Sequence, residues 1–212
     1  MTDTGYDFNK AAATWDDKAR RKELVENVFA AISTSVPITP RLRVLDFGCG
    51  TGLLALRLAP LVASVVCADT SRGMLDVLEE KIRAQQLNNV QALFLNPDSG
   101  NAFTHNSYDL IVTCMTLHHI KHITPLLERF KTCLTPGGHL CIADLDLDNG
   151  LFHEPRADVF HHGFDRRTLE GVLLQAGFKE VRHDTAATIE KTASDGNTRR
   201  FTVFVITGRM AV

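Results

Sequence analysis

Hydrophobic residues of this chain fall into short apolar runs that alternate with longer amphipathic stretches. The runs have the length of buried β-strands and are expected near residues 42–47, 64–69, 90–95, 109–114 and 138–145. Apolar residues recur at helical spacing near residues 52–62, 72–87 and 122–134, and a polar-faced helix is expected over residues 16–35. Strands that alternate with helices in this way are typical of a parallel, doubly wound α/β sheet.

The C-terminal part of the chain has a different pattern. A helix is predicted over residues 166–176, with Asp165 as its N-cap and Gly177 just after its end. Two apolar runs, residues 178–181 and 201–206, are separated by a polar loop that contains glycine. These runs predict an antiparallel hairpin at one edge of the sheet. With 212 residues, the chain is expected to form one α/β domain over residues 1–212.

Composition and charge narrow the classes of function. The net charge is −2, and no basic run marks a nucleic-acid surface. No apolar stretch reaches the roughly 18 residues of a membrane span, and the first residues lack the pattern of a signal peptide. The five cysteines include no C-x-x-C pair, so they are expected to be small buried residues in a reducing compartment. We therefore expect a cytoplasmic monomer or homodimer that binds neither nucleic acid nor a membrane.

The most informative run is VLDFGCGTG at residues 44–52, where an apolar strand leads into three glycines at every second position. Glycines allow a tight turn and let a ligand approach the main chain, and the following helix directs free N–H groups to the same place. A dinucleotide-binding loop has its third glycine one residue later, where this chain has Leu53. Asp46 would repel a pyrophosphate but could accept hydrogen bonds from an ammonium group. The ligand that joins such an ammonium group to a nucleoside is S-adenosylmethionine.

A second signal lies about 20 positions beyond the glycine loop. The strand near residues 64–69 ends in Asp69, at the position where one carboxylate can accept hydrogen bonds from both hydroxyls of a ribose. The helix that follows begins with Thr70 or Ser71 as its N-cap. The two linked signals indicate a nucleoside site next to the glycine loop.

These residues resemble the class I S-adenosylmethionine-dependent methyltransferases, in which D/E-x-G-x-G-x-G ends the first strand. The resemblance covers nearly the whole chain and includes a Pro-Gly-Gly turn at residues 136–138, before the fifth strand. It implies a Rossmann-like three-layer sandwich with a mostly parallel seven-stranded sheet and an antiparallel C-terminal strand. It also implies S-adenosylmethionine as the cofactor and S-adenosylhomocysteine as its product.

The resemblance assigns a set of cofactor-binding residues. The glycine loop with Asp46 would hold the methionine part, Asp69 the ribose, and Met74 the adenine. Asp98 is the candidate for the exocyclic amine of adenine, although residues 96–100 also read as an ordinary turn. Aromatic residues near the N-terminus resemble the family's lid, or else they only pack the first helix on the sheet. The complete predicted set is Tyr6, Trp15, Asp46, Gly48, Gly50, Gly52, Asp69, Thr70, Met74, Asp98 and Thr113.

The acceptor side of the site is predicted from two segments rich in histidine. Many small-molecule methyltransferases of this class have Leu-His-His after the fourth strand, where this chain has His118 and His119. A tuned imidazole there could act as a general base, although in-line positioning alone can supply much of the rate of methyl transfer. The insert at residues 150–165 contributes the candidate acceptor-binding residues Phe160, His161 and His162. We expect it to form the acceptor pocket together with the N-terminal lid and helix, residues 1–36.

Several alternatives remain open on the sequence. The run DLDLDNG at residues 144–150 resembles the start of a calcium loop, but it lacks the glycine and glutamate that such a loop needs. The histidines lack the spacing of a zinc site, so no metal is expected. A protein or RNA methyltransferase, a cofactor-binding partner subunit without activity, and a nucleotide-binding oxidoreductase are the competing functions. A small-molecule methyltransferase is the preferred interpretation, because the chain has no basic face and no added recognition domain.

Overall fold

The protein is described by a computed structural model over residues 5–95 and 103–211. A single seven-stranded sheet runs through it in the order β3-β2-β1-β4-β5-β7-β6. The strands are β1 Arg43–Phe47, β2 Ser64–Asp69, β3 Val90–Phe94, β4 Tyr108–Cys114, β5 Leu134–Leu145, β6 Lys179–Thr192 and β7 Thr198–Arg209. β7 pairs antiparallel with both of its neighbours, and the pairs from β3 to β5 are parallel. The predicted fold class is confirmed.

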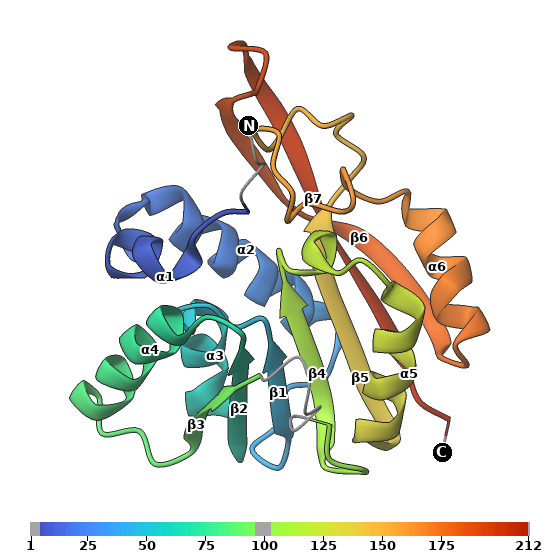
Figure 1. Cartoon of the computed structure of the whole chain (residues 1–212). Coiled ribbons are helices and arrows are strands. Elements are labelled where there is room, and N and C mark those ends of the chain that lie inside the picture. The colour runs from blue at the N-terminus through green and yellow to red at the C-terminus, as the bar shows by residue number, and fades with distance from the viewer. Residues whose placement is uncertain (1–4, 96–102, 212) are drawn as a thin grey trace.

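Helices cover both faces of the sheet, as Figure 1 shows. One face packs against α2, α3 and α4, and the other packs against α5 and α6. The α-helices are α1 Phe8–Ala11, α2 Ala19–Ser35, α3 Leu53–Leu58, α4 Arg72–Ala84, α5 Ile123–Cys133 and α6 Arg166–Gln175. The 3-10 helices are η1 Ala12–Asp17, η2 Ala59–Leu61 and η3 Leu117–His119. Within the described residues, no helix combines the length and the apolar character needed to cross a membrane.

The chain reverses direction across the sheet between β1 and β4. β1 pairs with β2 on one side and with β4 on the other, and β3 lies beyond β2. In an open α/β sheet, ligands bind outside the carboxyl ends of the strands at such a reversal. The glycine loop after β1, the end of β2 and the end of β4 all lie at this edge.

The structure corrects several predicted boundaries. The N-terminal helix begins at Ala19 rather than at residue 16, because residues 8–17 form the separate turns α1 and η1. The hairpin strands are much longer than their apolar runs, and β6 reaches Thr192. β6 is an edge strand in which buried Ala187 and Ile189 alternate with exposed polar residues. An alternating strand of this kind is not detected by a search for continuous apolar residues.

The helix ends follow the predicted caps where local chemistry decides them. Ser71, rather than Thr70, is the N-cap of α4, and its hydroxyl accepts a hydrogen bond from the Met74 N–H. Asp165 caps α6 by accepting from the Thr168 N–H at 2.8 Å. Gly177 has a φ of +97°, which is the left-handed conformation expected at the end of a helix.

Candidate cofactor and acceptor site

The glycine loop is left-handed at each of its three glycines. Gly48, Gly50 and Gly52 have φ angles of +71°, +54° and +81°, a region that side chains with a Cβ seldom occupy. A Cβ at Gly48 would lie 2.3 Å from Cγ2 of Thr116, and one at Gly52 would lie 2.4 Å from Cδ1 of Leu78. A Cβ at Gly50 would meet no atom within 4 Å. The loop is therefore closed around Gly48 and Gly52 and open to a ligand at Gly50.

Asp69 fixes the shape of this loop from the end of β2. Its Oδ2 accepts from the Gly50 N–H at 2.8 Å, and its Oδ1 accepts from the Ser71 N–H at 2.8 Å. Burial raises the pKa of Asp69, while the N–H donors of Ser71, Gly50 and Thr70 oppose that rise. A carboxylate has about four acceptor positions, so these backbone donors leave room for a ribose hydroxyl.

Asp46 is a buried carboxylate with an unpaired oxygen. Only 1% of the residue is exposed, and its Oδ2 has no hydrogen-bond partner among the described residues. Burial, together with the charge of Asp69, raises the pKa of Asp46 to about 7. A buried acceptor without a donor is costly, so its presence calls for an explanation. A cationic ligand in the open part of the loop would supply the missing donor.

The N-terminal segment, residues 5–17, is tied to the glycine loop by polar contacts that the sequence analysis missed. The Thr51 hydroxyl donates to Oδ1 of Asp16 at 2.6 Å, and Lys81 on α4 pairs with the other oxygen of Asp16. Lys81 also donates to the carbonyl of Thr51 at 2.8 Å. Side-chain pairs separated by 35 and 65 positions carry no local pattern that could have revealed them.

A second contact fixes the same segment to the start of α4. Oδ1 of Asn9 accepts from the Ser71 hydroxyl and from the Gly73 N–H, each at 2.9 Å. A Cβ at Gly73 would lie 2.8 Å from the Asn9 carbonyl, so glycine permits this close approach. The N-terminal segment thus contacts both the glycine loop and the start of α4.

The aromatic residues of the N-terminal segment form one cluster. The ring of Phe8 lies 5.0 Å from that of Tyr6 and 5.8 Å from that of Trp15, measured between centroids. Phe8 also packs edge-on against His119 at 5.5 Å. The Arg21 guanidinium covers the Trp15 ring at 3.4 Å, which is a close cation–π contact. The cluster therefore lies between the glycine loop and the histidines that follow β4.

His118 is held by a buried carboxylate at the end of β5. Its Nδ1 lies 2.7 Å from Oδ1 of Asp144, and its backbone N–H donates to Oδ2 at 3.3 Å. Both side chains are almost completely buried. Because the carboxylate is an acceptor, Nδ1 carries the proton and Nε2 remains as the basic nitrogen of the ring. Asp144 is therefore a candidate site residue. In the sequence it was noticed only as part of the run at residues 144–150 that resembles the start of a calcium loop.

Two further imidazoles surround His118. The His119 ring lies 4.2 Å away and the His153 ring 4.9 Å away. Burial and the neighbouring His118 lower the pKa of His119 to about 4, and the same two causes lower the pKa of His153. Both rings are therefore neutral at pH 7. His153 was not among the predicted residues, although the insert to which it belongs was predicted to line the acceptor pocket.

The other predicted cofactor residues have varied surroundings. Thr70 is exposed beside Asp69, and Met74 is buried in α4. Thr113 is buried with its hydroxyl unpaired, but it lies on the face of the sheet opposite Asp46. Thr116, which was not predicted, donates instead to the Gly48 carbonyl at 3.2 Å. Asp98 lies outside the described residues.

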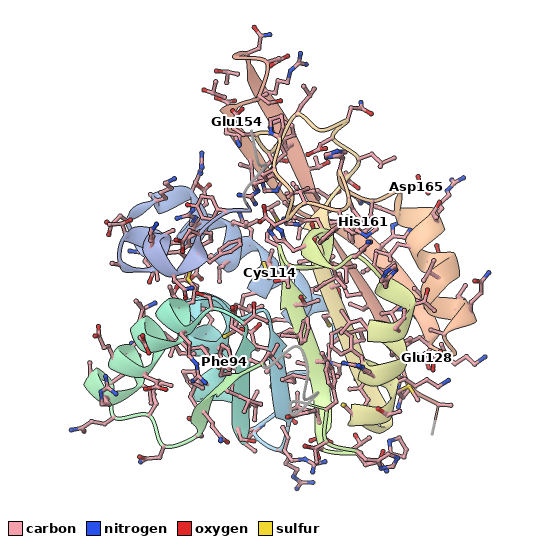
Figure 2. The ribbon with its side chains drawn as sticks, in the orientation of Figure 1. Phe94, Cys114, Glu128, Glu154, His161 and Asp165 are labelled. Atoms are coloured by element: carbon pink, nitrogen blue, oxygen red, sulfur yellow. The ribbon has the colours of Figure 1, made fainter. Side chains whose placement is uncertain are left out.

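The rings of His118, His119 and His153 form an imidazole cluster. The predicted acceptor residues of the insert do not all contact it. Figure 2 shows His161 and Glu154 above Cys114, which marks the carboxyl end of β4. Nε2 of His161 lies 2.9 Å from the Ile120 carbonyl, and its ring packs on Phe164 at 5.2 Å. Phe160 is 47% exposed, and His162 is exposed beside Gly150. The insert is held to η3 by the Phe160 N–H, which donates to the His118 carbonyl at 2.9 Å.

The acidic run at residues 144–150 is paired with groups of the protein. Asp146 forms two hydrogen bonds of 2.6 Å with the Arg166 guanidinium, and Asp148 accepts from the N–H groups of Gly150 and Phe152. Among the described residues, no group of three or more His, Cys, Asp or Glu side chains is arranged to hold a metal ion. The carboxylates of Asp146 and Asp148 therefore stabilise the local structure, and they do not form a metal site.

A doubly wound sheet, a glycine loop open at Gly50 and two acidic residues at the topological reversal define a nucleoside-binding α/β protein. Comparison with known proteins is more specific. A family described as "Methyltransferase domain" matches residues 45–140. An uncharacterized methyltransferase of Schizosaccharomyces pombe is 34% identical over 133 residues, which cover 57% of this chain and 47% of that protein. One from Mycobacterium tuberculosis is 32% identical over 127 residues, covering 58% and 62%.

A solved structure shares the fold over almost the full length of both chains. The S-adenosylmethionine-dependent methyltransferase of Aquifex aeolicus superposes with a TM-score of 0.69 at 18% identity, covering 96% of this chain and 98% of that one. The chain thus has the fold of the S-adenosylmethionine-dependent methyltransferases, and its residues 45–140 match the methyltransferase domain family. It spans about half to three-fifths of the length of the two curated relatives.

Proposed function

We propose that this protein transfers the methyl group of S-adenosylmethionine to a small-molecule acceptor. The observation that carries the proposal is the unpaired oxygen of Asp46, which feels the charge of Asp69, while Asp69 also accepts from the N–H of Gly50, where the loop is open. A buried acceptor there suits the ammonium group of the cofactor. A pyrophosphate would bring negative charge next to Asp46 and Asp69, so an NAD(P)-binding oxidoreductase is disfavoured.

The residues of the cradle have separate parts in cofactor binding. The backbone of Gly48, Gly50 and Gly52 would line the methionine part, Asp46 would accept from the ammonium group, and Asp69 would accept from the ribose hydroxyls. Bound S-adenosylmethionine supplies a methyl group already activated by its sulfonium. The full proposed set remains Tyr6, Trp15, Asp46, Gly48, Gly50, Gly52, Asp69, Thr70, Met74, Asp98 and Thr113.

His118 is the residue proposed to accept a proton from the acceptor. Its Nδ1–H is held by Asp144 at 2.7 Å, which leaves Nε2 basic and fixes the orientation of the ring. His119 packs on His118 and would help to exclude water from the reacting groups. Phe160, His161 and His162 complete the proposed acceptor-binding set.

The proposed acceptor is a small molecule rather than a protein or RNA. The insert and the N-terminal segment meet above the carboxyl ends of the strands, where the Tyr6 N–H donates to Oδ1 of Asp158 at 3.1 Å. Contact between these segments favours a small acceptor over a polymer. All five cysteines are free thiols, which suits the cytoplasmic location that we also propose.

Two measurements test this function. S-adenosylhomocysteine should raise the unfolding temperature of the protein in a thermal-shift assay, whereas NAD and NADP should leave it unchanged. Incubation with labelled S-adenosylmethionine and a metabolite extract should then label a small molecule. Stabilisation by NAD alone would contradict the proposal, and cofactor binding without labelling of any metabolite would favour a partner subunit without activity.

Trp15→Ala is expected to weaken S-adenosylhomocysteine binding by roughly tenfold, because Trp15 anchors the aromatic cluster and the loss of one such contact costs about 1 kcal/mol or more. Isothermal titration calorimetry measures the change. Leu174→Ala, which removes an exposed apolar side chain on α6, is the control and should bind like the wild type. Equal affinity in both variants would mean that the N-terminal segment does not cover the cofactor.

A further inference from the structure

Buried hydrogen-bond groups without partners lie beside the imidazole cluster. Nε of Arg156 and Nε2 of His153 are both buried and have no hydrogen-bond partner among the described residues, although Arg156 forms an ion pair with Asp158. The Arg156 side chain is only 16% exposed. Guanidinium nitrogens are always donors, and an unpaired buried donor is costly. At Asp46 the atom without a hydrogen bond is an acceptor, whereas Arg156 has a donor without one.

The contacts of Arg156 leave most of its donors unused. Its Nε lies 3.3 Å from Oδ1 of Asp158, and one terminal nitrogen lies 3.5 Å from Nε2 of His119. The guanidinium also faces the Tyr6 ring at 5.0 Å. Within the described residues, the carboxylate that contacts Arg156 is Asp158. Its Oδ1 already accepts from the Tyr6 N–H, and its Oδ2 lies 3.5 Å from Nδ1 of His119 without a hydrogen bond. A guanidinium has five N–H donors, so this single pair does not satisfy it.

Positive charge is concentrated around the same place. Besides Arg156, the cluster contains Lys191 on β6 and Lys18 and Arg20 at the start of α2, and we name these four residues the basic cluster. Burial lowers the pKa of Lys191, and the charges of Arg20, Lys18 and Arg156 lower it further, with Glu154 opposing them. Lys191 also donates to the Phe152 carbonyl, next to His153. Among the described residues, the acids recorded against these cations are Glu154 beside Lys191 and Asp158 beside Arg156, in a chain whose net charge is −2.

We infer that the basic cluster, through Arg156 and His153, binds an oxyanion of the methyl acceptor. This inference rests on the proposed function and specifies its acceptor as a small acid that carries a carboxylate or a phosphate. The flat fork of a guanidinium matches two oxygens of either group. An oxyanion would accept from Arg156 Nε, and from His153 in the tautomer that carries its proton on Nε2, and would balance the excess positive charge.

The position of this subsite also orients the acceptor. The His153 ring lies 4.9 Å from the His118 ring, and Arg156 touches His119. An acid held by Arg156 and His153 would therefore present a second functional group to His118, on the side of the cofactor cradle. Positioning of this kind is the main contribution that a methyltransferase can make to the rate.

Anion binding can be measured without turnover. Protein saturated with S-adenosylhomocysteine is titrated with sodium acetate in one series and inorganic phosphate in another, and the ring signals of the histidines are followed by NMR. At least one anion is expected to shift the signals of His153 and His119, and the series that does so identifies the oxyanion as carboxylate or phosphate. Arg156→Gln should weaken the shift by about tenfold or more, and Arg156→Lys should recover part of it. The inference is overturned if neither anion shifts these signals.

Arg182→Gln provides a matched control, because Arg182 is exposed near the start of β6, whereas Lys191 of the basic cluster lies near the other end of that strand. It should bind acetate and phosphate like the wild type. Both variants should bind S-adenosylhomocysteine with unchanged affinity, which establishes that they are folded. Equal anion binding by the Arg156→Gln and Arg182→Gln proteins would also overturn the inference.

Turnover separates this inference from the proposed function. Labelled S-adenosylmethionine is incubated with small carboxylic acids, phosphomonoesters and their neutral amides or alcohols. Methylation of acids, lowered about tenfold or more by Arg156→Gln, supports both proposals. Methylation of neutral compounds alone, unaffected by Arg156→Gln, overturns the subsite but keeps the methyltransferase. Arg156-dependent anion binding without turnover on any compound keeps the subsite and contradicts the enzyme.

Discussion

Gly50→Ala is expected to weaken S-adenosylhomocysteine binding at least about tenfold while the protein remains folded. A Cβ at Gly50 meets no protein atom within 4 Å, so the methyl group would project into the open part of the cradle. The only cost to folding is the left-handed φ of +54°, which is worth about 1–2 kcal/mol for a residue with a side chain. Calorimetry measures the affinity, and urea unfolding measures the stability.

Gly196→Ala is the matched control for this substitution. Gly196 has a φ of +82°, also has no atom within 4 Å of a Cβ, and lies in the turn between β6 and β7. Both variants should therefore lose similar stability, and only Gly50→Ala should lose affinity. If Gly50→Ala binds S-adenosylhomocysteine as tightly as Gly196→Ala, the cofactor does not approach the loop at this residue. Gly48→Ala cannot serve this purpose, because its Cβ would overlap Thr116.

Asp46→Asn is expected to weaken S-adenosylhomocysteine binding by about 10- to 100-fold, because a hydrogen bond to a charged group is worth about 1.5–3 kcal/mol. The affinity of the wild type should also rise with pH up to about 7, since the pKa of Asp46 is raised to about 7 and the ammonium group needs the ionised carboxylate. The affinity of the variant should lack this pH dependence. Calorimetry at several pH values between about 5 and 8 measures both effects, and equal affinities at every pH would contradict the assigned role.

The same substitution should have the opposite effect on stability without ligand. The pKa of Asp46 is about 7 in the folded protein and 3.8 in an unfolded chain. Below both values the carboxyl is neutral in both states. Above both, the folded protein carries a buried charge at a cost of about 4 kcal/mol at most. The free energy of unfolding of the wild type should therefore fall as the pH rises from about 4 to about 7. Asp46→Asn should be more stable than the wild type at about pH 8.

Asp109→Asn gives a control with the reverse sign. The Arg43 guanidinium lowers the pKa of Asp109, so this carboxylate stabilises the fold above its unfolded pKa, and the contribution is lost as the pH falls through its folded pKa. Asp109→Asn should therefore be slightly less stable than the wild type at about pH 8 and should bind S-adenosylhomocysteine normally. If Asp46→Asn were also less stable than the wild type, Asp46 would not be an uncompensated buried charge.

The proposed cofactor-binding residues could be named from the sequence because their signals are local. A glycine at every second position, with an acid before the first, is required by the backbone of one short loop, so the requirement is written in adjacent residues. Asp69 could be predicted for a related reason, since the end of the next strand is fixed by a short helical connection. Thr116 was missed because it reaches the Gly48 carbonyl across 68 positions of sequence.

The acceptor half could be predicted only as a region. The insert was expected near the carboxyl ends of the strands, but the pattern could not show which of its histidines turn toward η3. His153 lies beside His118, while His161 hydrogen-bonds to the Ile120 carbonyl. Both residues look alike in sequence, because each is a histidine that follows a phenylalanine. Only the path of a loop without regular structure distinguishes them.

The sequence by itself determined the sheet, its flanking helices, the glycine loop and the acids that flank it, because hydrophobic period and backbone conformation are local requirements. The tertiary structure alone decided what surrounds the glycine loop and the histidines after β4. It joins Asp16 to Thr51, Asp144 to His118 and Tyr6 to Asp158, across 35, 26 and 152 positions. Such pairs depend on how separate elements pack. Residues far apart in sequence become partners only when folding brings their elements together and buries their polar groups.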